Sequence, residues 1–97
     1  MTREEIMNMS EEELRTAIID NIWFYHSESF QPTMNIEDAW RVKEKIGLPI
    51  SLVESMLGDS FSCEFLIDYD KWKVVEAVGM TAPLAICRAA LLTLEAK

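Results

Sequence analysis

The sequence has few basic residues, few glycines and a single histidine among its 97 residues. Nine Lys and Arg against 17 Asp and Glu give a formal charge of −8, which argues against binding to nucleic acid or to an anionic membrane surface. Three glycines provide no glycine-rich loop to cradle a phosphate, and one histidine, His26, excludes a metal site built on two histidines. We therefore expect no catalytic residues, no metal and no cofactor, and interpret the protein as a non-enzyme.

Cysteines and long apolar runs are also scarce. Cys63 and Cys87 are the only cysteines, and their spacing does not resemble a metal site. We expect both to be buried free thiols in a reducing cytosol, since no feature of the sequence indicates a disulfide. The acidic start of the chain lacks the apolar core of a secretion signal, and no run reaches the roughly 20 residues of a transmembrane helix. The sequence therefore predicts a cytoplasmic protein without a membrane segment.

Capping residues mark the helices of the first half. Thr2 and Ser10 are each followed by Glu three residues later, and these two capping boxes predict a short helix over 3–8 and a longer one from Glu11 to near Trp23. Asn35 as a cap and Gly47 as a terminator predict a helix over 36–46. Between them, the polar, proline-containing stretch 24–34 is typical of a loop.

The second half contains strand patterns. Residues 61–68 alternate apolar and polar side chains, as in a half-buried strand, and 72–78 are rich in β-forming residues, so the two predict a hairpin. Residues 50–57 fit either a helix or a strand, because a short apolar segment cannot be settled by its period alone. The simplest interpretation is that residues 50–57 join the hairpin as the third strand of an antiparallel meander.

The stretch 81–94 is the most apolar in the chain. Thr81 can cap a helix and Pro83 falls in its first turn, while an apolar stripe runs along one face, made by Leu84, Cys87, Leu91 and Leu94. The remaining sides are mostly alanine, and Arg88 is the only charge. A helix with so little polar surface must be covered on several sides. We expect a central helix packed by the sheet, by neighbouring helices and, on its alanine-rich back, by a second subunit.

Together these elements predict one α+β domain over 1–97, in which a three-stranded antiparallel meander packs with helices in the order α-α-β-β-β-α. Double-stranded-RNA-binding domains share an α–β–β–β–α order, but they need basic residues for phosphate contacts, which this acidic chain lacks. We therefore expect no nucleic-acid partner.

Three stretches resemble the phage ABA sandwich domain family of small phage and prophage proteins. They are 1–6, 36–45 and, most specifically, Thr81-Ala-Pro-Leu-Ala-Ile-Cys-Arg-Ala-Ala-Leu91. The resemblance extends over nearly the whole chain and is weakest over 24–33. It implies an α/β sandwich, a viral or prophage origin and hence the cytosol of a bacterial host, and it supports the strand alternative for 50–57. It implies no catalytic residues.

The candidate ligand-binding residues are aromatic, basic or titratable: Trp23, Tyr25, His26, Trp40, Arg41 and Arg88. The aromatic rings, with Trp72 as a further candidate, can stack on a ligand or lie in the core, and the two arginines can bind phosphate oxygens in pairs. His26 can act alone as a general base or be a loop residue without a role. Arg88 has three alternatives, which are to reach solvent, to pair with an acid, or to point into a pocket.

These features lead to a prediction of a non-catalytic phage or prophage binding protein. One form of it is a homo-oligomeric sponge that sequesters a nucleotide immune signal, with stacking aromatic rings and an arginine at the subunit boundary, and so acts against host defence. The other form is an acidic inhibitor, or interaction module, that binds a host protein directly, since strong negative charge suits a basic protein surface.

Overall fold

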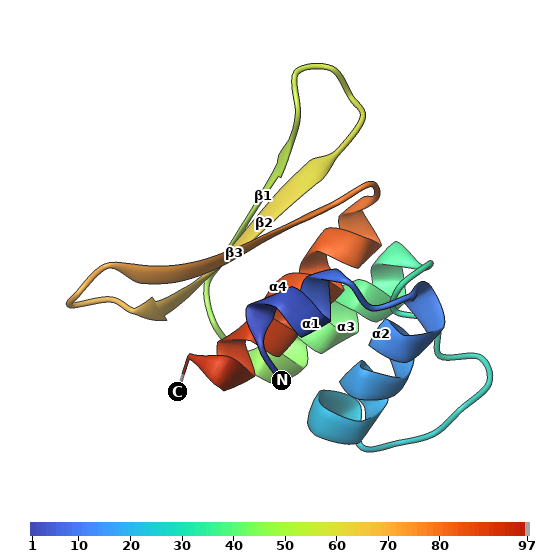
Figure 1. Ribbon diagram of the computed structural model, residues 1–97. Helices are drawn as coiled ribbons and strands as arrows, with labels where there is room; N and C mark the ends of the chain where they lie inside the picture. The colour runs from blue at the N-terminus through green and yellow to red at the C-terminus, as the bar shows by residue number, and fades with distance from the viewer. Residues whose placement is uncertain (97) are drawn as a thin grey trace.

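A computed structural model describes residues 1–96 as a three-stranded antiparallel sheet with helices on one side (Figure 1). The sheet order is β1-β2-β3, so consecutive strands are neighbours, as predicted. The elements in chain order are α1 (Arg3–Met7), α2 (Glu11–Ile18), the π-helix η1 (Ile19–Trp23), α3 (Ile36–Ile46), β1 (Ile50–Glu54), β2 (Phe61–Asp68), β3 (Lys73–Gly79) and α4 (Ala82–Glu95). The predicted α+β class is confirmed, as is the order of helices, then three strands, then a final helix.

Both capping boxes form as predicted. The Thr2 hydroxyl accepts a hydrogen bond from the Glu5 N–H, and the Glu5 carboxylate accepts one from the Thr2 N–H. Ser10 and Glu13 repeat this exchange at the start of α2. The backbone N–H of each capping residue, and then its hydroxyl, hold the pKa of the Glu5 and Glu13 carboxyls below the usual value.

The second predicted helix reaches Trp23, but its last turn is a π-turn rather than an α-turn. The Phe24 N–H donates to the Ile19 carbonyl at 2.6 Å, and Phe24 itself ends the helix in the left-handed region, with φ of 63°. A π-turn holds one more residue than an α-turn, and no capping or spacing signal in the sequence marks it. The helix over 36–46 is as predicted, with Asn35 accepting from Glu37 and Asp38 and with Gly47 left-handed after the last turn.

The open alternative for residues 50–57 resolves as a strand, although a shorter one. β1 ends at Glu54, and the chain then turns through 55–58, where Gly58 has φ of 72°. Met56 and Leu57 therefore lie on an exposed turn instead of continuing the strand. Ile50 and Leu52 pair with Phe65 and Cys63 of β2, which places all four side chains on the same face of the sheet.

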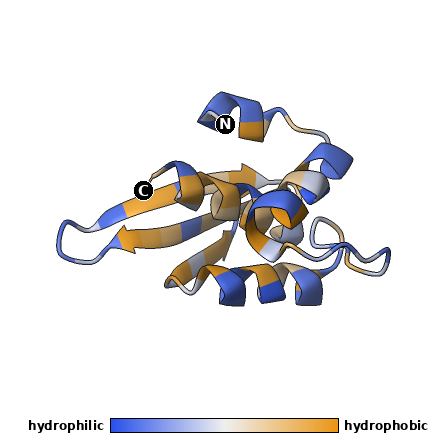
Figure 2. Cartoon of the chain, turned by 90° about the horizontal axis from the view of Figure 1, so that it is seen from below, coloured by the Kyte–Doolittle hydropathy of each residue, from blue (hydrophilic) through white to orange (hydrophobic). Residues whose placement is uncertain are grey.

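The helices cover only one face of the sheet, the one that carries Cys63 and Phe65. Cys63, Phe65 and Ala77 are fully buried on it, whereas Val53, Val74 and Val78 on the opposite face are each more than 40% exposed. We call this opposite side the outer face, made by Ser51, Val53, Ser62, Glu64, Leu66, Val74, Glu76 and Val78. Figure 2 shows hydrophobic residues along the strands and hydrophilic ones in the turn between β2 and β3.

Helix α4 lies at the centre of the molecule, in contact with all three strands and with α1, α2 and α3. Ten of its residues are buried. The alanine-rich back includes Ala89 and Ala90, which are fully buried within the single chain. The expectation that these alanines pack against a second subunit is therefore wrong, because they are already covered within one chain.

Both cysteines are buried and free, as expected. Burial raises the pKa of the Cys63 thiol to about 12 and raises that of Cys87 as well, so neither is a reactive thiolate. No helix within residues 1–96 has the length and apolar character needed to cross a membrane.

Two arginines cover the free edge of β3. Arg3 donates to the Glu76 carbonyl at 2.6 Å, and Arg88 donates to the Val78 carbonyl at 2.8 Å. The two carbonyls are two residues apart on the strand and so point to the same side, and the arginine donors mark that side as the one away from β2. Arg88 thus fits none of its three predicted alternatives fully, since its partner is a backbone carbonyl. Its Nε atom is buried without a hydrogen-bond partner among residues 1–96.

Candidate functional site

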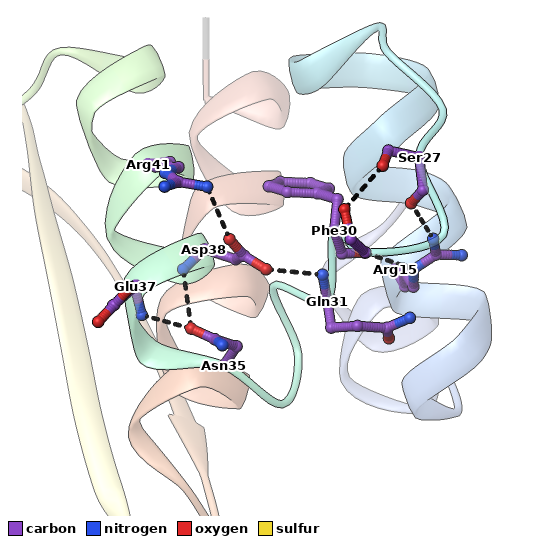
Figure 3. A network of polar contacts seen from close by, with 9 residues as sticks. Arg15, Ser27, Phe30, Gln31, Asn35, Glu37, Asp38 and Arg41 are labelled. Carbon is purple, nitrogen blue, oxygen red and sulfur yellow. Dashed lines mark hydrogen bonds and ion pairs between the residues drawn. The ribbon is translucent and has the colours of Figure 1, made fainter.

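The connection between the π-helix and α3 is irregular but firmly held from the α2 side. The Arg15 side chain donates from Nε to the Phe30 carbonyl and from Nη2 to the Ser27 carbonyl, both at 2.8 Å. Figure 3 shows the guanidinium reaching from α2 to these two points of the loop. Phe30 is buried, and its ring stacks on that of Trp23 with 4.5 Å between centroids. The polar loop predicted over 24–34 is therefore an ordered part of the fold.

Asp38 holds the same loop from the α3 side. One carboxylate oxygen accepts from the Gln31 N–H at 2.9 Å, and the other lies 3.1 Å from a guanidinium nitrogen of Arg41 (Figure 3). The Asp38 side chain is only 9% exposed, whereas that of Arg41 is 60% exposed. Asp38 therefore anchors the loop and orients Arg41, whose guanidinium remains largely open to solvent.

We predict that Asp38→Ala lowers the free energy of unfolding by about 2 kcal/mol, because it leaves the Gln31 N–H without its acceptor and removes the partly buried ion pair with Arg41. Glu37→Ala is the matched control, since Glu37 is the neighbouring acid of α3 and is exposed. Urea denaturation followed by circular dichroism measures both variants. Equal, small losses in the two would contradict the anchoring role of Asp38.

Two of the predicted ligand-binding residues come together on α3. Trp40 and Arg41 line a shallow hollow of about 330 Å³, together with Ile36, Glu37 and Glu44. The Trp40 side chain is partly exposed, and the Lys43 ammonium lies 5.3 Å from the centroid of its ring. This hollow therefore combines an aromatic surface with a guanidinium that has unused donors.

The other predicted ligand-binding residues do not line this hollow. Trp23 is stacked on Phe30, as described above. Tyr25 and His26 are exposed just after the π-helix, and the His26 imidazole lies 3.5 Å from the Asp20 carboxylate. Arg88 belongs to the edge of β3. No cluster of three or more His, Cys, Asp or Glu side chains suited to a metal occurs among residues 1–96.

Sequence reasoning missed a second hollow, which lies on the outer face of the sheet. Its volume is about 160 Å³, and its walls are Pro49, Ile50, Ser51, Glu64, Leu66, Trp72 and Val74. Trp72 was identified as a stacking candidate, but its neighbours depend on strand register and on a turn, neither of which a single sequence specifies. Alternating charge on the strands was the signal available, since Glu64 and Glu76 both fall at outward positions.

Comparisons with known proteins agree with this fold. A family model described as the phage ABA sandwich domain matches residues 4–91. A crystal structure of a phage protein from Bacillus cereus ATCC 14579 superposes with a TM-score of 0.74 at 22% identity, covering 91% of this chain and 90% of the other. No curated protein matches the chain. Because the family model spans most of the sequence, the chain belongs to the phage ABA sandwich domain family.

Proposed function

We propose that this protein is a non-catalytic phage binding protein that sequesters a nucleotide signal of the host at the Trp40–Arg41 hollow. The observation that carries the proposal is the juxtaposition of an exposed aromatic ring with an exposed, pre-oriented guanidinium. Sequestration in the bacterial cytosol by a homo-oligomer would deprive a host defence system of its signal.

The chemistry of the hollow suits a nucleotide with few phosphates. A base stacks on the Trp40 ring, and such stacking contributes about 1–3 kcal/mol per base. Arg41 then donates hydrogen bonds to a phosphate from the guanidinium N–H groups that do not bind Asp38. Glu37 and Glu44 line the same hollow and can accept from ribose hydroxyls or exocyclic amines. These two carboxylates also disfavour a heavily charged ligand, so cyclic nucleotides and ADP-ribose derivatives are the best candidates.

The test is a thermal-shift screen against cyclic and ADP-ribose-type nucleotides, followed by calorimetric titration of the hits. A ligand that binds the native state raises the melting temperature by mass action. We predict that Trp40→Ala and Arg41→Ala each weaken binding by about tenfold or more, the equivalent of about 1.4 kcal/mol. Tyr69→Ala is the control, because Tyr69 is an exposed aromatic residue outside the hollow.

Sedimentation of the free protein tests the oligomer in the same samples. The proposed sponge has a mass in solution above the 11.2 kDa of one chain. Flat melting curves across the nucleotide panel, with a monomeric mass, would refute the proposal.

A second candidate function is direct contact with a host protein. The uncovered outer face of the sheet favours it, because exposed apolar side chains that gather on one surface mark interaction sites. The formal charge of −8 directs such an interaction toward a basic partner.

A further inference from the structure

The outer face has an acidic centre between apolar ends. In the strand register, Glu64 lies directly opposite Glu76, and the rows on either side pair Val78 with Ser62 and Val74 with Leu66. Like charges that face each other across two strands destabilise a sheet. No Lys or Arg forms a salt bridge with either carboxylate among residues 1–96. The fold alone therefore gives no reason for this pair.

The hollow on the outer face opens beside these carboxylates. Glu64 forms part of its wall, Leu66 and Val74 supply an apolar surface, and the Trp72 ring stands at its end near the turn between β2 and β3. Trp72 has φ of 52°, a left-handed conformation that is costly for a bulky residue, and its side chain is 69% exposed. The Tyr69 ring packs against it in a T-shaped arrangement, with 5.7 Å between the ring centroids. A strained backbone thus presents a supported indole to solvent.

These groups match one kind of occupant. A long basic side chain lays its methylene stem along apolar surface and carries a cationic head. In this hollow the stem of such a side chain would contact Leu66 and Val74, and its head would lie between the Glu64 carboxylate and the Trp72 indole, which attracts cations through its quadrupole. Arginine fits better than lysine, because its planar guanidinium both stacks on a ring and binds a carboxylate in a bidentate way.

We propose that the outer face is a docking surface for a basic partner protein, which inserts an arginine side chain between Glu64 and Trp72. The exposed valines of the outer face supply apolar contacts beside this anchor. The proposal rests on the second candidate function and is independent of the nucleotide site, because Trp40 and Arg41 line a different hollow.

A second copy of this chain is a poor occupant of the same face. In an isologous dimer each patch meets its own copy, so the Glu64–Glu76 pair of one chain would approach that of the other. Four carboxylates would then gather in a buried interface between two chains of charge −8. Charge complementarity therefore selects a partner with a basic surface.

The experiment is an NMR titration of the intact ¹⁵N-labelled protein with a short synthetic peptide that carries one arginine between valines. The control peptide has citrulline at that position, which keeps the shape and removes the charge. We expect the arginine peptide to shift the amide signals of Glu64, Leu66, Trp72 and Val74, and the citrulline peptide to bind about tenfold more weakly. Equal binding of the two peptides, or no shifts on the outer face, would overturn the proposal.

Two variants sharpen the result. Glu64→Gln and Trp72→Phe should each weaken the arginine peptide, while Glu64→Gln also raises the melting temperature by relieving the repulsion from Glu76. Unchanged peptide affinity in Glu64→Gln would refute the site. Affinity capture from host cells tests the function separately. The arginine peptide can bind while no host protein is captured by the native protein and lost with Glu64→Gln. In that case the second candidate function is refuted, and the arginine-binding site is still supported.

Discussion

Replacing Gly79 with alanine is expected to lower the free energy of unfolding by about 3 kcal/mol, through overpacking at the junction of β3 and α4. A Cβ atom at this position would lie 2.6 Å from the Ala85 backbone nitrogen and 2.9 Å from the Leu84 Cβ. Both neighbours belong to the first turns of α4, which is buried against the sheet and against other helices, so neither can move away cheaply. Chemical denaturation monitored by circular dichroism measures the loss.

Gly58→Ala is the matched control for this substitution. Its added Cβ meets nothing closer than 3.4 Å, where the neighbour is a side-chain oxygen of Glu54. The expected loss is about 1 kcal/mol and comes from the left-handed backbone alone. If Gly79→Ala proved no more harmful than Gly58→Ala, the close contact between the end of β3 and the start of α4 would be disproved.

Leu91→Ala is expected to cost about 3 kcal/mol, because it removes a side chain from the centre of the core and leaves a cavity there. Leu91 is fully buried on α4, where sheet and helices meet. Leu94→Ala provides the comparison, since Leu94 lies one turn later on the same stripe and is only half-buried. We expect Leu94→Ala to cost less than half as much, since its side chain loses less contact with the core.

Urea unfolding curves of both variants check this prediction. The free energies of unfolding are compared with the same dependence on urea concentration for both variants. Similar losses of the free energy of unfolding in Leu91→Ala and Leu94→Ala would contradict the prediction. They would show that the middle of α4 is no more enclosed than its end. Amide exchange offers an independent reading, because a central helix opens only with the whole fold.

Much of this fold was predictable because the sequence marks it locally. Thr2, Ser10, Asn35 and Thr81 each begin a helix through a side-chain oxygen, an interaction that involves only residues two or three positions away. The apolar run after Thr81 likewise indicated a buried helix. The helices form where these local signals predict them, because the tertiary contacts favour the same structure.

The parts that escaped prediction depend on residues far apart in sequence. The π-turn at Ile19–Trp23 and the left-handed Phe24 lie at the entrance to the loop that Arg15 holds from α2. The end of β1 at Glu54 depends on its pairing with Phe61 rather than on its own composition. For the same reason the sequence could place Trp40 beside Arg41 on one helix, whereas it could not predict that Glu64 and Trp72 line one hollow.

The arginines at the edge of β3 have a consequence for self-association. A foreign strand can add beside β3 only by displacing two charge-assisted hydrogen bonds, those from Arg3 to Glu76 and from Arg88 to Val78. β1 carries no lysine or arginine between Ile50 and Glu54 to oppose such an addition. Amyloid-like growth from the native protein would therefore proceed in one direction, outward from β1, and a single lysine at Val53 would suffice to slow it.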